Sequence, residues 1–240
     1  FDQDVGPVAY SPARRSGARI HPQRERHPVR KIVVNTFLTL DGVMQGPGGP
    51  NEDREGGFEH GGWSVNYWDD RMGQFVGEGL SQPFDLLLGR KTYDIFAAHW
   101  PHATDEAAGP LNAATKYVVS TTLASADWGP AVLIRDNVVE QLTRLKQGDG
   151  PDLQVHGSSQ LVQTLMANDL VDQFRLMIFP LTLGSGKQLF GDGVRPGNLR
   201  LVDSQESTTG VIIAAYEPAG DVRYGSFALE DQPTTPEGAP

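Results

Sequence analysis

The stretch LQVHGSSQL, residues 153–161, decides the fold predicted for this chain. Its first half alternates apolar and polar residues, and from Leu161 onward apolar residues recur at helical spacing, so a strand is expected to lead directly into a helix. The first turn of that helix has unpaired N–H groups and the positive end of the dipole. Because glycine has no Cβ, Gly157 would let a ligand approach the backbone closely. The junction therefore predicts a pyrophosphate site, although an ordinary serine N-cap gives the same pattern.

A second junction of this kind lies at Gly89-Arg90-Lys91-Thr92, between an apolar run and a helical pattern. Arg90 offers a planar fork for a 2′-phosphate, and Thr92 offers a hydroxyl. Ser120-Thr121-Thr122 follows the next expected strand with more hydroxyls. Anion sites at the carboxyl ends of neighbouring parallel strands suit a dinucleotide. The alternative interpretation of residues 89–92 is a surface arginine at the start of a capped helix, with no ligand.

Strand and helix patterns alternate on both sides of these junctions, which predicts an α/β fold with a mostly parallel sheet and helices on both faces. Two runs at 199–207 and 210–217, separated by Thr208-Thr209, predict an antiparallel hairpin at the C-terminal end. The other expected strands are residues 31–40, 84–88, 117–120, 132–134, 153–155 and 174–179, and the expected helices are 69–80, 91–98, 138–146 and 159–167.

The composition bounds the domain organisation and the partners. One domain is expected over residues 31–218, with tails at 1–30 and 219–240, although 224–229 could pair briefly with a strand. The net charge of −10 argues against nucleic acid as a partner. No apolar run approaches the ~20 residues that span a bilayer, and no secretory signal is evident. No membrane partner is therefore expected. Because the chain contains no cysteine, we expect a cytoplasmic protein.

Other catalytic classes find little support in the motifs. The histidines show no His-Glu-x-x-His spacing, and without cysteines no metal site is expected. No Gly-x-Ser-x-Gly elbow occurs, which disfavours serine hydrolysis. Lys187 follows a glycine-rich run but precedes Gln188, so the phosphate-binding pattern Gly-x-x-x-x-Gly-Lys-Ser/Thr is absent.

Residues 45–62 contain seven glycines and two prolines, which predicts a long mobile loop. Trp63 and Trp68 follow the loop. They could stack on a planar substrate when the loop closes as a lid, or they could simply close the edge of the core.

Six motifs in order resemble the reductase domain of bacterial riboflavin biosynthesis and the dihydrofolate-reductase-like proteins related to it. The resemblance covers about residues 31–217. The motifs are Thr39-Leu40-Asp41-Gly42, Gly89-Arg90-Lys91-Thr92, Ser120 after its strand, His156-Gly157-Ser158-Ser159 before Leu161, Leu170-Val171-Asp172 before Phe174, and the run from Pro180 to Gly186 continuing through Leu189-Phe190.

The resemblance implies a dihydrofolate-reductase-like mixed sheet that binds NADPH along its carboxyl edge, and a homodimer for which the C-terminal hairpin could be the interface. Asp41 is the first candidate proton donor, and Asp69 or Asp70 is the second. Thr39, Trp63 and Trp68 are the expected substrate contacts. The expected cofactor contacts are Gly89, Arg90, Lys91, Thr92, Ser120, Thr121, Gly157, Ser158, Ser159 and Gln160.

Three departures bear on the substrate. The riboflavin reductases commonly have a substrate-binding glutamate two residues before the turn glycine, where this chain has Val155, and a basic residue after Asp-Gly, where it has Val43. The turn reads Gly-Ser-Ser where many relatives have several glycines. We therefore expect an NADPH-dependent reductase of a small planar heterocyclic or carbonyl/imine substrate. The alternatives are a 5-amino-6-(5-phosphoribosylamino)uracil reductase and a non-catalytic nucleotide-binding protein on the same fold.

Overall fold

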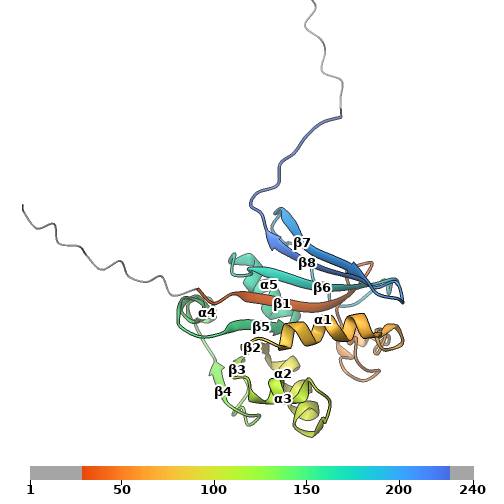
Figure 1. Cartoon of the computed structure of the whole chain (residues 1–240). Helices are drawn as coiled ribbons and strands as arrows, with labels where there is room; N and C mark the ends of the chain where they lie inside the picture. Colours follow the sequence, from red (N-terminus) through yellow and green to blue (C-terminus); the bar gives the residue numbers. More distant parts are fainter. Residues whose placement is uncertain (1–28, 228–240) are drawn as a thin grey trace, which may run out of the picture.

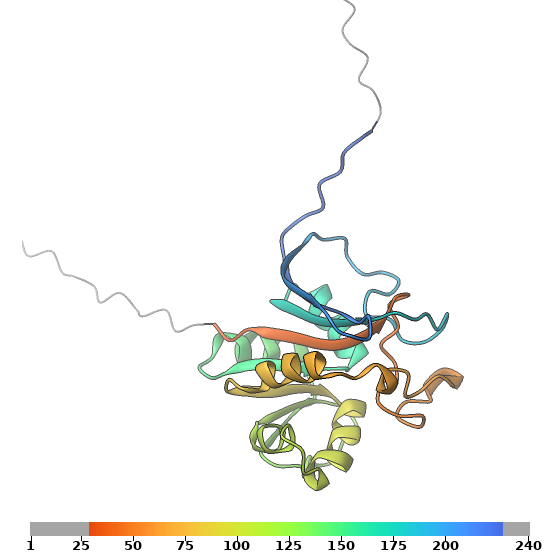
Figure 2. The ribbon, with the colours of Figure 1, turned by 45° about the vertical axis from the view of Figure 1, so that its right-hand side comes forward.

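The computed structural model describes residues 29–227 as one eight-stranded sheet with helices packed on both of its faces (Figure 1; Figure 2). The strand order is β4-β3-β2-β5-β1-β6-β8-β7. Most of the two predicted tails lies outside the described residues. Residues 219–227 form no helix or strand, so the described part of 224–229 adds no strand to the sheet.

The sheet is mixed, as the sequence predicts. Every pairing among the first six strands is parallel, whereas β8 pairs antiparallel with β6 and β7. The strands are β1 (Ile32–Thr39), β2 (Phe84–Gly89), β3 (Lys116–Val119), β4 (Ala131–Ile134), β5 (Asp152–His156), β6 (Gln173–Phe179), β7 (Leu199–Glu206) and β8 (Ile212–Pro218).

The two faces of the sheet carry different helices. α4 (Val138–Gln147) and α5 (Ser159–Ala167) cover one face, where Val34 and Val155 are buried. The opposite face carries α1 (Asp70–Leu80), α2 (Arg90–His99) and α3 (Ala108–Ala113). Because strand residues alternate between faces, the odd-numbered residues of β1 and β6 point toward α1. That second face holds the cavity described below.

One α-helix was not predicted, and neither were three short 3-10 helices. α3 contains Gly109 and Pro110, whose poor helix propensity hides it in the sequence. It forms because Ala108 and Leu111 are buried against the sheet. The 3-10 helices lie at Glu55–Gly57, Val65–Tyr67 and Trp100–His102.

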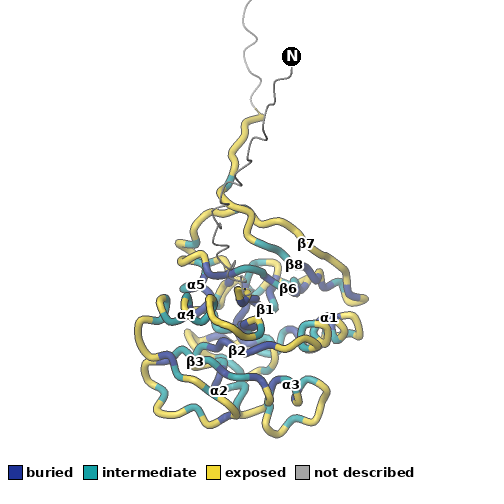
Figure 3. The backbone as a smooth tube through the Cα atoms, turned by 60° about the vertical axis from the view of Figure 1, so that its left-hand side comes forward, coloured by how far each residue is buried: buried dark blue, intermediate teal, exposed yellow. Residues whose placement is uncertain are grey.

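Burial is greatest in the central strands and falls toward the edge strand β7, as Figure 3 shows. All eight residues of β7 are exposed, and Leu199, Leu201 and Val202 are among them. An exposed apolar edge strand suits pairing with a second copy, but the homodimer stays a prediction. None of the helices between residues 29 and 227 is both long and apolar enough to cross a bilayer.

Lys116 is an unusual member of the core. Its side chain is fully buried, its Nζ donates to the carbonyl oxygen of Asn112 at 2.6 Å, and it lies 4.3 Å from the centre of the Trp128 ring. Burial disfavours the ammonium ion and lowers the pKa of Lys116 to about 8. Between this value and the ordinary 10.5 the unfolded chain binds more protons, so folding stability rises with pH through this window.

We therefore expect Lys116→Met, which removes the buried charge, to gain stability relative to the native chain at pH 7 and to lose part of that advantage by pH 10. Denaturant unfolding at the two pH values measures the difference in the free energy of unfolding. Lys31→Met, at an exposed lysine near Glu217, is the control and should show a smaller change. A Lys116→Met difference that is identical at both pH values would show that the folded lysine titrates normally.

Candidate cofactor and substrate cavity

The two strand-to-helix junctions singled out in the sequence lie side by side. β2 and β5 are parallel neighbours in the sheet, so their carboxyl ends meet, and α2 and α5 begin at that edge. The Gly89 N–H donates to Ser158 Oγ at 3.0 Å, and the Ser158 N–H donates to Thr92 Oγ1 at 3.0 Å. Each junction thus holds the other in place.

The backbone at the second junction is left-handed at two successive residues. Gly157 has φ +50° and Ser158 has φ +56°. Ser158 Oγ donates to the His156 carbonyl at 2.9 Å, which holds the serine in this conformation. A Cβ on Gly157 would lie 3.3 Å from Thr92 Oγ1. The turn therefore brings the unpaired first-turn N–H groups of α5 to the cavity edge with no side chain at position 157.

The third predicted cluster joins this edge through Arg90. The Arg90 Nη1 donates to Thr122 Oγ1 at 2.5 Å, and its Nε lies 3.3 Å from Asp94 Oδ2. Ser120 Oγ accepts the N–H groups of Thr122 and Leu123, which closes the turn after β3. The guanidinium and three hydroxyls are thus gathered beyond the end of β2 and β3.

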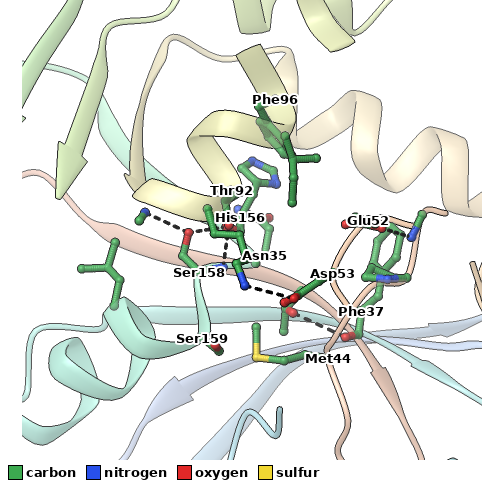
Figure 4. Close-up of a pocket in the computed structure, with 18 of the residues that line it drawn as sticks. Asn35, Phe37, Met44, Glu52, Asp53, Thr92, Phe96, His156, Ser158 and Ser159 are labelled. Carbon is green, nitrogen blue, oxygen red and sulfur yellow. Dashed lines mark hydrogen bonds and ion pairs between the residues drawn. The ribbon is translucent and has the colours of Figure 1, made fainter. Parts of the chain in front are cut away.

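All the residues predicted to contact the cofactor line one cavity of about 1060 Å³. They are Gly89, Arg90, Lys91, Thr92, Ser120, Thr121, Gly157, Ser158, Ser159 and Gln160. Figure 4 labels Thr92, Ser158 and Ser159 among them. The volume lies just above the usual range for small-molecule pockets, about 300–1,000 Å³. The cavity continues from this edge across the sheet between α1 and α2, which leaves room beside the junctions for a second molecule.

The floor of that inner part is the sheet itself. Asn35, His156 and Arg175 lie on it, with Phe37 and Met177 toward the carboxyl ends of the strands. Phe75, Val76, Gly79 and Leu80 of α1 form one wall, and Ile95 and Phe96 of α2 form the opposite wall. The cavity therefore combines apolar walls with a floor that is partly polar.

The glycine-rich loop lies over one side of the cavity and is tied down by ion pairs. Asp53 lies 3.1 Å from Lys91 Nζ and 2.7 Å from Lys187 Nζ, and Glu55 pairs with the same two lysines. Burial alone would raise the pKa of Asp53, but the hydrogen bonds from Lys187, the Glu55 N–H and Lys91 outweigh it and hold that pKa below its ordinary value. The four charges connect the loop to α2 and to the segment before Leu189.

Residues 30–213 match the RibD C-terminal domain family, which is most of the chain. The chain belongs to that family. It is 32% identical to the uncharacterized protein YyaP of Bacillus subtilis (strain 168) over 192 residues, which are 78% of this chain and 94% of YyaP.

Solved structures show the same fold at low sequence identity. A putative riboflavin biosynthesis protein from Shewanella sp. PV-4 has a TM-score of 0.60 and 18% identity, with 79% of this chain and 99% of that chain covered. Dihydrofolate reductase from Enterococcus faecalis, solved with NADP(H), has a TM-score of 0.51 and 12% identity, with 78% and 96% covered. The predicted dihydrofolate-reductase-like fold and family resemblance are therefore confirmed.

Within this RibD C-terminal domain, Thr39 and Asp41 lie outside the cavity lining. The Asp41 carboxylate accepts the Thr39 hydroxyl and the N–H groups of Leu183 and Gly184, the last at 2.6 Å. The Thr39 hydrogen bond, followed by that of Gly184, lowers the pKa of Asp41. An ionised carboxylate with three partners is poorly suited to donate a proton. The geometry instead gives Asp41 the task of holding the 183–187 segment.

Asp69 and Trp63 also lie away from the cavity lining. Asp69 is the N-cap of α1, and the hydrogen bond from the Met72 N–H, at 3.0 Å, is the main cause that lowers its pKa. Trp63 donates its indole N–H to the Gln45 carbonyl at 2.8 Å and packs edge-on against Phe179. Trp68 does line the cavity, with 49% of its surface exposed.

The cavity wall contains an acid that the sequence did not single out. Glu52 lies in the glycine-rich loop, where Gly49 donates its N–H to Oε2 at 3.1 Å and Gly48 donates to the same oxygen. Burial raises the pKa of Glu52 above its ordinary value, although these hydrogen bonds oppose the shift. The sequence signal that could have identified Glu52 is the group of acidic residues at 52–55 inside the glycine-rich loop. The described residues hold no group of three or more histidine, aspartate or glutamate side chains that could bind a metal ion.

Val155 and Val43, two positions at which the sequence suggests a departure from the riboflavin reductases, both lie in the core. Val155 is buried in the core beneath α4 and α5, on the face opposite the cavity. Its neighbour His156 faces the cavity. Val155 therefore does not line this cavity, whereas His156 does. Val43 forms an isolated antiparallel bridge with Gln188 and is fully buried.

Proposed function

We propose that this protein is an NADPH-dependent reductase that transfers a hydride to a small planar substrate with a C=N or C=O bond. The observation that carries the proposal is that every predicted cofactor contact lines one cavity, which continues over an apolar and polar floor. Family membership supports the same reductase-type role.

The residues fit the cofactor. The first turn of α5 and the bare Gly157 offer N–H groups for the pyrophosphate, because no Cβ blocks the approach. Arg90 and the hydroxyls of residues 120–122 would hold the 2′-phosphate. When bound, the nicotinamide supplies the hydride. The chain's own contribution is to position the two molecules and to exclude water beneath the loop.

Hydride addition to a C=N or C=O carbon leaves negative charge on the nitrogen or oxygen, and that atom needs a proton. Asp41 and Asp69 stay predictions of the sequence alone, because the pKa of each is lowered and neither lines the cavity. Glu52 lines the cavity and has a raised pKa. We therefore assign the proton donor to Glu52.

We expect NADPH to bind about ten-fold to a hundred-fold more tightly than NADH, because a charged hydrogen bond contributes roughly 1.5–3 kcal/mol. Arg90→Ala should remove most of this preference. Titration calorimetry with both cofactors measures it. Arg144→Ala is a matched control, since Arg144 also pairs with an acid one turn away on an exposed helix surface but lies outside the cavity.

Equal affinities for the two cofactors in the native chain would show that the 2′-phosphate site is misassigned. Binding of NADPH without its oxidation by any member of a pterin, quinone and imine panel would favour the non-catalytic alternative.

A further inference from the structure

Three polar side chains form a row across the floor of the inner cavity. In the sheet register Asn35 of β1 lies beside His156 of β5 and beside Arg175 of β6. Residues in register share a face, so the three side chains point into the same space. Figure 4 shows Asn35 and His156 among the lining residues. The backbones at His156 and Arg175 are two strand spacings, or about 10 Å, apart.

Arg175 is a cation with free hydrogen-bonding capacity. Its Nη2 donates to the Phe75 carbonyl at 2.9 Å, and its guanidinium lies 4.1 Å from the centre of the Phe75 ring, which fixes its plane. None of the acids among residues 29–227 forms an ion pair with it; Glu78 and Asp203 act on it only from farther away. Other N–H donors of the fork are left for a ligand.

The space for this guanidinium is provided by α1. A Cβ on Gly79 would lie 3.1 Å from Arg175 Nη1, so glycine at this position leaves the fork unobstructed. Lys91 and Lys187, the lysines of the cavity lining, are already paired with Asp53 and Glu55. Arg175 is therefore the cation of the inner cavity that an anionic ligand could pair with.

His156 lies on the same cavity floor, and one nitrogen of its ring is an acceptor. Gln154 Nε2 donates to the Gly79 carbonyl at 2.6 Å, which fixes the amide so that its Oε1 faces His156 Nε2 at 3.2 Å. The proton of the ring therefore resides on Nε2, and Nδ1 carries the lone pair. Burial, together with the charge of Arg175, lowers the pKa of His156 to about 4, so the ring is neutral at pH 7.

The rest of the inner cavity suits a flat ring. Phe37, Phe75, Phe96 and Trp68 surround it with aromatic surface.

We propose that the substrate is an anionic heteroaromatic compound whose carboxylate binds Arg175 and whose opposite edge donates a hydrogen bond to His156 Nδ1. This assignment rests on the reductase function proposed above, since it places the substrate in the cavity beside the cofactor residues. Asn35, between the two, contacts the ring edge.

Indole-6-carboxylate and indole-6-carboxamide test the proposal, because they share a shape and an N–H but differ in charge. Ligand-observed NMR titration against the full chain gives both affinities. We expect the carboxylate to bind about ten-fold or more tightly than the carboxamide, as a charged hydrogen bond requires. Arg175→Met should abolish this preference, and Arg175→Lys, a point charge without the fork, should keep part of it. Arg200→Met, at an exposed arginine on β7, should leave it unchanged.

Three results would overturn the assignment: equal affinities of the two compounds for the native chain, binding of neither at millimolar concentration, or a preference that survives in Arg175→Met. NADPH titration of the same variants separates this failure from that of the proposed function. Loss of the carboxylate preference with normal NADPH binding supports the role of Arg175, whereas a native chain that binds no NADPH refutes the reductase proposal itself.

Discussion

Gly157→Val is expected to abolish NADPH binding, with affinity reduced at least about a hundred-fold. The new Cβ would lie 3.3 Å from Thr92 Oγ1, the atom that accepts the Ser158 N–H. It would also occupy the gap through which a pyrophosphate approaches the first turn of α5. Titration calorimetry measures the loss, and thermal unfolding measures the accompanying change in stability.

Strain alone must be separated from the loss of the binding gap. A β-branched residue at the φ of +50° found at Gly157 costs about 1–2 kcal/mol in any protein. Gly193→Val is the matched control, because Gly193 has φ +82°, lies outside the cavity and has no neighbouring atom within 4 Å of the place that a Cβ would take. Both variants should lose stability, and only Gly157→Val should lose NADPH. Normal NADPH affinity in Gly157→Val would reduce the junction to an ordinary capped helix start.

The strands and the cofactor edge could be predicted because their signals are local. β1 is apolar on most residues since it is buried between β5 and β6, and such a run is recognisable in any window. The junctions at Gly89 and Gly157 combine a strand end, a glycine and a hydroxyl within a few residues. Their convergence then follows from the parallel sheet, in which the carboxyl ends of neighbouring strands meet.

The parts that could not be predicted depend on distant contacts. Asp41 resembles a catalytic acid in the sequence, but its partners Leu183 and Gly184 are 142 and 143 residues away. The row of Asn35, His156 and Arg175 depends on the register of three strands, which the apolar pattern does not define to one residue.

The glycine-rich loop shows both what local composition can predict and what it cannot. Its composition predicted a mobile segment, and composition carries no information about Lys187, which pairs with Asp53 from 134 residues away. Gln45 adds a second tie, since its side chain accepts the Lys187 N–H at 3.0 Å and donates to the Glu55 carbonyl at 3.0 Å. The loop is therefore a cover held by specific contacts rather than a free insertion.

Replacing residues 46–57 with a short linker is expected to lower turnover at least about ten-fold, while the melting temperature and NADPH affinity change little. The loop carries Glu52 and both acids of the ion-pair group, so its removal opens the cavity to water and removes the proposed proton donor. Phe58, which is buried at 6% exposure, remains to protect the core. Turnover is measured with whichever member of the substrate panel the native chain reduces.

One double variant and one point variant divide this effect between closure and proton transfer. Asp53→Asn combined with Glu55→Gln keeps the loop length but removes its charges opposite Lys91 and Lys187, so it should weaken closure and raise the KM for substrate. Glu52→Gln keeps those charges, and should lower kcat with little change in KM because the amide cannot donate the proton as an acid does. Unchanged turnover in the shortened chain would remove the loop from the mechanism. Unchanged kcat in Glu52→Gln would leave closure of the cavity as the only task of the loop. The ion pairs hold the loop over the cavity whether or not the carboxyl of Glu52 donates the proton.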